Sequence, residues 1–206
     1  MKNLLQINTS IFSTVGQSSR LAERFVAAWR EANPGASVTV RDLASQPVPH
    51  LDAAQFSAFT AKPEERTVEQ QAAANYSEAL IAELKAADVI VLGLPLYNFG
   101  LPSTLKAYFD QIGRAGHTFK YTAQGPVGLL SGKKAFVFAA RGGLYEGTPR
   151  DTQTSYVRDF LGFMGITDVD FVYAEGLAIS EESKNASLAR AHRKIEDITA
   201  PEAIAA

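Results

Sequence analysis

The chain of 206 residues contains no cysteine. This absence excludes disulfide bonds, thiolate nucleophiles and thiolate metal sites. No apolar run approaches the roughly 20 residues that a membrane-spanning helix needs. The first ten residues, MKNLLQINTS, hold one lysine and an apolar run too short for a signal peptide. From these absences we expect a soluble cytoplasmic protein without a metal centre.

The chain also lacks a large net charge of either sign. Twenty lysines and arginines face 22 acidic residues, which leaves a formal net charge of -2. Nucleic acids and anionic membranes attract strongly basic surfaces, so we expect neither as a partner. The length suits one well-buried domain, and the chain has no internal repeat or linker. We therefore predict a single domain over residues 1–206.

Apolar strands and amphipathic helices alternate along the chain, which predicts an α/β fold with a parallel sheet and right-handed crossovers. The arrangement resembles a flavodoxin-like three-layer sandwich with strand order 2-1-3-4-5. The expected strands are 4–7, 37–41, 89–94, 134–139 and 169–174. The expected helices are 17–31, 69–86, one starting at Pro102 and Ser103, one within 153–164, and 181–198. Residues after 41, with Pro47 and Pro49, are expected to form a loop.

Open α/β sheets bind ligands at the carboxyl ends of their strands, where the strand order reverses. The loop over residues 8–19 leaves the first strand and enters a helix, whose free N–H groups favour an anion. Ser10 and Ser18 add hydroxyl donors, whereas lysine, GxxxxGK[ST] and GxGxxG are absent. A single terminal phosphate bound by neutral donors fits this loop. Alternatively, its serines only cap the helix.

Two further loops are expected at the same edge. Tyr97-Asn98-Phe99-Gly100 follows a continuous apolar run and suits a planar heteroaromatic ring, or else it is a turn packed into the core. After the fourth strand, Gly142 and Gly143 let backbone approach a ligand closely. Arg141 beside them would stabilise negative charge, or it is a surface arginine on a tight turn.

The segment 117–132 is predicted to be a short β-excursion, because Phe119 and Tyr121 alternate with Lys120. Its aromatic face would wall the site or meet a second subunit. His117 is a candidate acid or base, although a lone histidine beside an aromatic loop is more often a surface or packing residue.

Four stretches carry a resemblance that covers nearly the whole chain. They are residues 94–122 (LPLYNFGLPSTLKAYFDQIGRAGHTFKYT), the spaced SRL…WRE…TVRDL, the ARGG turn, and FLGFMGITDV. In order and spacing they resemble FMN-dependent NADH-azoreductases, also called FMN-dependent NADH:quinone oxidoreductases. The resemblance implies bound FMN, NADH or NADPH as electron donor, and two-electron reduction of quinones and azo compounds. It also implies a homodimer with flavin sites at its interface.

The resemblance assigns residues as follows. The residues that would bind the FMN phosphate and ribityl chain are Ser10, Gly16, Gln17 and Ser18. Those that would line the isoalloxazine ring are Leu96, Tyr97, Asn98 and Phe99. Those that would contact the pyrimidine side of the ring are Ala140, Arg141, Gly142 and Gly143. We place Phe119, Tyr121, Tyr145 and Phe163 in the substrate pocket. The chain departs from the family at Gly16 and Ala140, where serine is common, and at Leu96, where methionine is common. A good neutral hydrogen bond contributes roughly 0.5–1.5 kcal/mol, so the loss of two hydroxyls leaves open a weaker flavin affinity. Because the backbone N–H groups at both turns are kept, we expect FMN binding to persist.

In this interpretation the flavin performs the chemistry and no side chain acts as nucleophile. One slot serving donor and acceptor in turn predicts ping-pong kinetics. Preference for NADPH would need an arginine near the site, and Arg114, Arg141 and Arg150 are candidates. Two alternatives are a flavodoxin-type electron carrier, which the balanced charge disfavours, and a hydrolase, which the absence of GxSxG disfavours.

Overall fold

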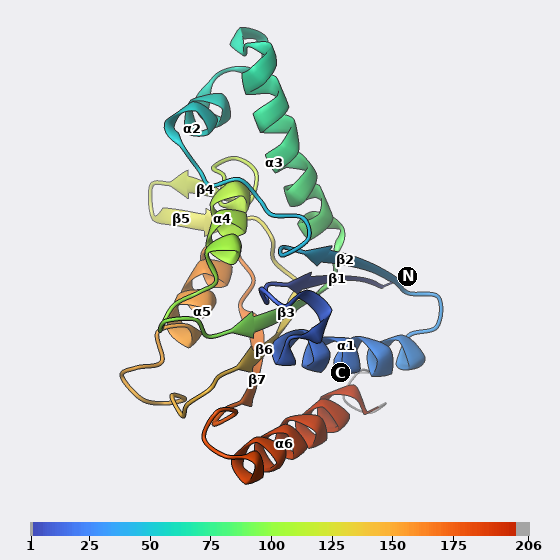
Figure 1. Ribbon diagram of the computed structural model, residues 1–206. Coiled ribbons are helices and arrows are strands. Elements are labelled where there is room, and N and C mark those ends of the chain that lie inside the picture. The colour runs from blue at the N-terminus through green and yellow to red at the C-terminus, as the bar shows by residue number, and fades with distance from the viewer. Residues whose placement is uncertain (1, 201–206) are drawn as a thin grey trace.

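The computed structural model describes residues 2–200 and contains a parallel sheet of five strands in the order β2-β1-β3-β6-β7 (Figure 1). The central strand β3 is buried along its whole length, as expected for a strand covered on both faces. The strands are β1 (Asn3–Asn8), β2 (Ser37–Asp42), β3 (Val89–Pro95), β6 (Lys134–Ala140) and β7 (Asp168–Ala174). The predicted α/β class, flavodoxin-like sheet and strand order are confirmed.

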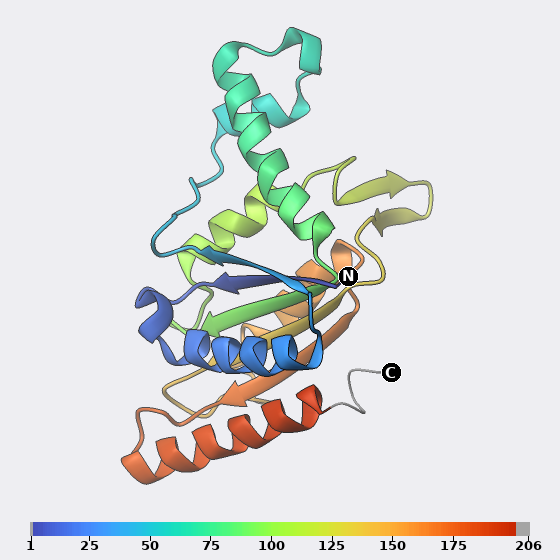
Figure 2. The ribbon, with the colours of Figure 1, turned by 90° about the vertical axis from the view of Figure 1, so that its right-hand side faces the viewer.

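Helices cover both faces of this sheet and bury a separate apolar core on each. One layer holds α1 and α6, whose core includes Phe25 and Trp29. The opposite layer holds α3, α4 and α5, whose core includes Leu80, Tyr108 and Leu161 (Figures 1 and 2). The helices are α1 (Gln17–Ala32), α3 (Val68–Ala86), α4 (Ser103–Ile112), α5 (Thr154–Phe163) and α6 (Glu181–Thr199). The bounds of α1, α3 and α6 agree with the prediction to within one residue, α4 begins at the predicted Ser103, and α5 lies within the predicted range 153–164.

A short helix lies where we predicted only a loop. Residues Ala53–Thr60 form α2, which Asp52 caps by accepting a hydrogen bond from the Gln55 N–H at 2.8 Å. This helix packs against α3 rather than against the sheet, and only Ala58 in it is buried. Because so little of α2 is buried, its sequence lacks a clear core-facing stripe. Together α2 and α3 form a prominence that stands away from the sheet (Figure 2).

The predicted β-excursion between α4 and β6 is confirmed. It is an antiparallel hairpin of β4 (Phe119–Thr122) and β5 (Gly125–Gly128), and it projects from the body of the molecule (Figure 2). Between residues 2 and 200, no helix combines the length and the apolar character needed to span a bilayer.

Candidate functional site at the carboxyl edge of the sheet

The loops after β1, β3 and β6 meet at the carboxyl edge of the sheet. The Tyr97 hydroxyl lies 3.3 Å from Ser10 Oγ and accepts a hydrogen bond from the Ile11 N–H at 3.3 Å. The Leu96 N–H donates to the Ala140 carbonyl at 3.1 Å, which joins the second loop to the third. The rings of Phe99 and Tyr145 meet edge to face, with centroids 5.7 Å apart. The structure therefore brings together the three loops that we expected to share one rim.

The first loop delivers an uncapped helix end to this rim. Helix α1 begins at Gln17 after Gly16, and no side chain accepts a hydrogen bond there as a cap. Within residues 2–200 the N–H groups of Gln17, Ser18 and Ser19 have no acceptor. The buried Ser18 hydroxyl likewise has no partner in that range. The serines thus do not cap this helix, and its unpaired N–H groups and dipole favour an anion.

Close contact explains the glycine at position 16, where the family commonly has serine. A Cβ there would lie 2.2 Å from Ser10 Oγ and 2.6 Å from Ser10 Cβ. The φ of Gly16 is -66°, which any residue adopts, so lack of space rather than backbone conformation requires glycine. Ser10 fills that space and also accepts the Phe12 N–H at 3.2 Å. The loop therefore keeps one hydroxyl here, supplied by Ser10.

The second loop is a tight two-residue turn with an unusual backbone. Tyr97 and Gly100 exchange backbone hydrogen bonds, and Asn98 and Phe99 between them have φ values of 49° and 59°. A left-handed phenylalanine is strained, and such strain concentrates at functional sites. In residues 2–200, the non-glycine residues with positive φ are Ser13, Asn98 and Phe99, all within these loops. Phe99 is 52% exposed, so its ring is not packed into the core.

The third loop presents backbone rather than charge. The Arg141 side chain is fully buried, and its Nη1 and Nη2 donate to Glu175 at 3.0 Å and Asp151 at 2.8 Å. It is therefore neither a surface arginine nor a cation directed at a ligand. Within residues 2–200 the N–H groups of Gly142 and Gly143 have no acceptor, which leaves them able to bind the polar edge of a ring.

Two carboxylates hold the third loop in place through Arg141. Glu175 accepts the N–H groups of Tyr145 and Glu146, both at 3.0 Å. Burial would raise the pKa of Asp151, but hydrogen bonds from Arg141 and Thr154 outweigh this effect and lower it. Asp151 therefore stays ionised and keeps Arg141 paired.

Sequence reasoning missed two residues that hold the second loop from behind. The Gln153 Nε2 donates to the carbonyls of Pro95 at 2.9 Å and Gly100 at 3.1 Å. The Thr152 hydroxyl donates to the Phe99 carbonyl. Both residues precede α5 and belong to no recognisable motif, so only the fold reveals their role.

Three predicted pocket residues lie apart from this rim within one chain. Phe119 packs against Phe163 and Tyr121, with ring centroids 4.2 and 5.4 Å apart, at the base of the hairpin. The hairpin and the first loop lie on opposite sides of the molecule in Figure 2. Within one chain these three aromatic residues therefore do not reach the three loops. Tyr145, by contrast, lies beside Phe99 on the rim.

The structure also shows where His117 and the three arginines considered for an NADPH phosphate lie. His117 Nε2 lies 3.4 Å from Arg114 and its pKa is lowered, first by burial and then by the Arg114 charge. It belongs to the α3–α4 side rather than to any of the three loops. Arg114 and Arg141 are buried, which leaves Arg150 as the exposed member of the three arginines considered for an NADPH phosphate.

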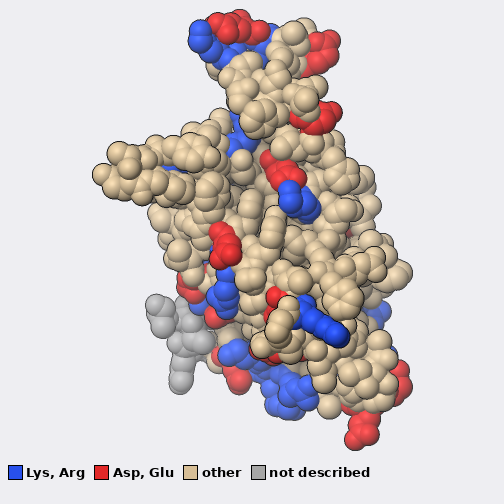
Figure 3. Space-filling model, turned by 90° about the vertical axis from the view of Figure 1, so that its left-hand side faces the viewer, with Lys and Arg blue, Asp and Glu red and all other residues tan. Residues whose placement is uncertain are grey.

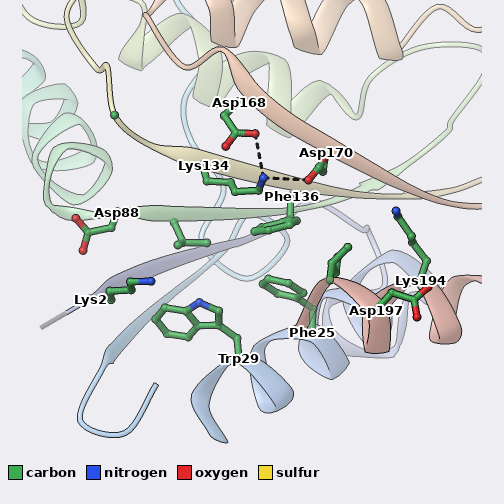
Figure 4. A pocket seen from close by; sticks show the side chains of 13 residues that line it. Lys2, Phe25, Trp29, Asp88, Lys134, Phe136, Asp168, Asp170, Lys194 and Asp197 are labelled. Atoms are coloured by element: carbon green, nitrogen blue, oxygen red, sulfur yellow. Dashed lines mark hydrogen bonds and ion pairs between the residues drawn. The ribbon is translucent and has the colours of Figure 1, made fainter. Parts of the chain in front are cut away.

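A cavity of about 700 Å³ lies at the opposite, amino edge of the sheet (Figure 4). Aromatic residues of α1 and β6 line it together with lysines and aspartates, and Lys134 bridges Asp168 and Asp170. It shares no residue with the three loops. Among residues 2–200, no group of three or more histidine, aspartate or glutamate side chains is placed to hold a metal ion.

The sheet and its three-loop rim define a protein of the flavodoxin-like class, and the model of the flavodoxin-like fold family matches residues 2–198. Curated relatives narrow this class. The chain is 55% identical to an FMN-dependent NADH:quinone oxidoreductase of Cellvibrio japonicus, over 95% of this chain and 98% of the relative. It is 56% identical to an enzyme of the same name from Paraburkholderia phymatum, with the same coverage. The chain belongs to the FMN-dependent NADH:quinone oxidoreductase family and is an oxidoreductase.

A solved structure supports the same assignment. The FMN-dependent NADH-azoreductase of Bacillus anthracis in complex with FMN superposes with a TM-score of 0.89 at 30% identity. The alignment covers 98% of this chain and all of that one. The resemblance to FMN-dependent NADH-azoreductases and NADH:quinone oxidoreductases is thus confirmed. The names of these relatives specify FMN as the cofactor.

Proposed function

We propose that this chain, as one FMN-binding domain, uses NADH to reduce quinones by two electrons and to cleave azo compounds to amines. The observation that carries the proposal is the meeting of an uncapped helix end with a strained aromatic turn at one rim. An electron carrier or a hydrolase would not account for the names of the relatives, which specify NADH:quinone oxidoreduction.

The residues at the rim fit the parts of FMN. The N–H groups of residues 17–19 and the hydroxyls of Ser10 and Ser18 suit its phosphate and ribityl chain. Leu96, Tyr97, Asn98 and Phe99 would line the ring. The bare backbone of Gly142 and Gly143, together with the preceding residues Ala140 and Arg141, would contact its pyrimidine edge. Bound there, FMN would supply two-electron transfer between NADH and an acceptor.

The chain's own contribution is to bind and orient. Neutral donors hold the dianionic phosphate, which fixes the flavin without a competing cation. The left-handed turn presents Phe99 as an exposed flat surface near the ring, and Tyr145 borders the same space. NADH and one proton reduce a quinone to a hydroquinone, whereas cleaving an azo bond to two amines consumes two NADH. Because one open slot would serve both substrates, they would bind in turn.

The visible spectrum of the purified protein tests the cofactor, with the released chromophore identified by chromatography. Flavin bands and released FMN are expected. Initial rates at several fixed concentrations of NADH and benzoquinone test the order of binding. Parallel double-reciprocal lines are expected, and intersecting lines would contradict the shared slot. A colourless protein that takes up no added FMN would overturn the proposal as a whole.

We also propose a homodimer in which the partner covers the open side of the flavin. Exposed apolar side chains on the prominence and the hairpin include Phe56, Val68 and Tyr121, the last two 82% and 74% exposed. The projecting hairpin carries almost no charge in Figure 3, so it is suited to contact another protein. A second copy would bring its Phe119, Tyr121 and Phe163 toward the site. Sedimentation should give twice the chain mass, and Tyr121→Asp should reduce it.

Two finer points complete the proposal. We propose a cytoplasmic location, because the NADH in the relatives' names is an intracellular metabolite. Cell fractionation tests this location. Since Arg150 is exposed near the third loop, NADPH could also serve as donor, and comparing kcat/KM for NADH and NADPH in Arg150→Ala would show whether this arginine contributes.

A further inference from the structure

We propose that Gln153 is a positioning residue for the flavin: its buried side-chain amide holds the turn Tyr97–Gly100 in the left-handed form that faces the ring. The inference rests on the proposed FMN site. It concerns a residue that the family resemblance does not assign, and that touches neither the rim surface nor a reacting group.

The contacts of Gln153 are specific to this turn. Its side chain is fully buried, and one amide nitrogen donates to two carbonyls, Pro95 at 2.9 Å and Gly100 at 3.1 Å. These carbonyls bracket the two left-handed residues, Asn98 and Phe99. The Thr152 hydroxyl donates a hydrogen bond to the Phe99 carbonyl. Two neighbouring side chains therefore bind three of the six carbonyls in the segment 95–100.

The strain of the turn makes such external support necessary. A non-glycine residue at positive φ is strained, and this conformation persists only where its surroundings enforce it. The turn's own cross-turn bonds, at 2.9 and 3.4 Å, are few. Without Gln153, the Pro95 carbonyl would lose this donor, and the Gly100 carbonyl would keep only the bond from the Tyr97 N–H at 3.4 Å. The turn would then relax and Phe99 would leave its position.

The support continues to the third loop. The Gln153 N–H donates to Asp151 Oδ1 at 3.3 Å, and Asp151 pairs with Arg141. Arg141 in turn pairs with Glu175, which binds the backbone of Tyr145 and Glu146. One hydrogen-bonded chain thus links the turn at Phe99 to the loop at Gly143. Gln153 fixes the end of this chain that would lie against the flavin ring.

Gln153→Leu removes the amide while keeping a side chain of similar size. The matched control is Gln111→Leu, because Gln111 is equally buried and its amide also donates to a backbone carbonyl, that of Pro49. Two measurements apply: the FMN dissociation constant by flavin fluorescence, and hydrogen exchange of peptide 96–101 in the flavin-free protein. We expect Gln153→Leu to weaken FMN binding about tenfold and to speed exchange in that peptide. Gln111→Leu should change neither by more than about twofold, although both variants lose thermal stability.

Gln153→Glu keeps the test valid if the leucine variant fails to fold. An ionised carboxylate facing two carbonyls is repelled, whereas the protonated acid donates one hydrogen bond. FMN affinity should therefore improve in this variant as the pH falls from 8 to 5.5, relative to wild type and to Gln111→Glu. Equal effects at positions 153 and 111 would overturn the inference, as would unchanged exchange in peptide 96–101. Because exchange is read without FMN, failure of the wild type to bind FMN would overturn only the proposed function.

Discussion

At the amino edge of the sheet a lysine pairs with two aspartates, whereas at the carboxyl edge several backbone N–H groups and a serine hydroxyl have no partner within residues 2–200. At the amino edge, Lys134 bridges Asp168 and Asp170, and the Asn3 N–H donates to Asp88 at 2.8 Å. At the carboxyl edge, the helix N–H groups and the Ser18 hydroxyl have no partner within residues 2–200. Backbone strain follows the same division, since Asn98 and Phe99 lie at the carboxyl edge.

This difference shows what identifies a binding site in this fold. The amino edge holds a cavity, and among the charged residues that line it Lys134 pairs with Asp168 and Asp170. The carboxyl edge holds unpaired donors and a strained turn, and both cost free energy that a ligand can offset. The candidate site is therefore marked by unpaired donors and strain rather than by empty volume.

The largest effect should come from Arg141→Met, which leaves Asp151 and Glu175 buried without their cation. Breaking a buried ion pair costs about 3–5 kcal/mol. The matched variant at the amino edge is Lys134→Met, whose partners are exposed, and it should cost about 1 kcal/mol or less. Urea denaturation measures both. Equal losses would show that the buried pairs of Arg141 contribute no more to stability than the exposed pairs of Lys134.

Gly16→Ala should have the next largest effect, because the added methyl group would lie 2.2 Å from Ser10 Oγ. Displacing Ser10 disturbs the first loop, so FMN binding should weaken about tenfold, which is near 1.4 kcal/mol. Gly162→Ala is the control, since a Cβ there meets nothing within 4 Å. Fluorescence titration of FMN measures both variants. Tight binding by Gly16→Ala would show that Ser10 is not needed in its present position.

A smaller effect concerns pH. The pKa of Asp151 is lowered on folding, so its ionised form stabilises the native state at pH values above its unfolded pKa of about 4. That stabilisation is lost as the pH falls through the lower, folded pKa. Asp151→Asn should therefore be less stable than wild type at pH 7, and this difference should narrow below about pH 4. Unfolding free energies across this range would refute the pairing if the difference stayed constant.

The smallest effect is expected at His117, which lies beside Arg114 and belongs to none of the three loops. Since burial and the Arg114 charge lower its pKa, the imidazole is mainly neutral at pH 7. His117→Asn should leave kcat/KM for NADH within about twofold of wild type, with an unchanged pH profile. A large fall in kcat would restore His117 as an acid or base candidate.

Much of the fold was predictable because its signals are local. The run VIVLGLP in β3 is typical of a fully buried strand, and β1 and β6 are buried along most of their length as well. Helix α2 was not predictable in the same way, since it packs on α3 and buries only Ala58. The sequence of α2 therefore carries no strong periodicity.

The candidate site was predictable in its backbone but not in its side-chain directions. The glycine pair Gly142 and Gly143 predicts that the backbone can approach a ligand closely, and in the fold both residues lie on the rim. Arg141 beside them gave no sign that its guanidinium turns inward, because its partners Asp151 and Glu175 lie 10 and 34 residues further on. Gln153 was missed for the same reason, since its acceptors are 53 and 58 residues away.

The three loops of the rim come from residues near 10, 97 and 142, and they adjoin only once β1, β3 and β6 have paired. A chain that has not completed its parallel sheet therefore cannot hold the flavin. Ligand that binds only the native state increases the free energy of unfolding in proportion to the logarithm of its concentration. A molecule loaded with flavin would thus unfold less often than a flavin-free one and would be cleaved more slowly by a protease that attacks the unfolded chain.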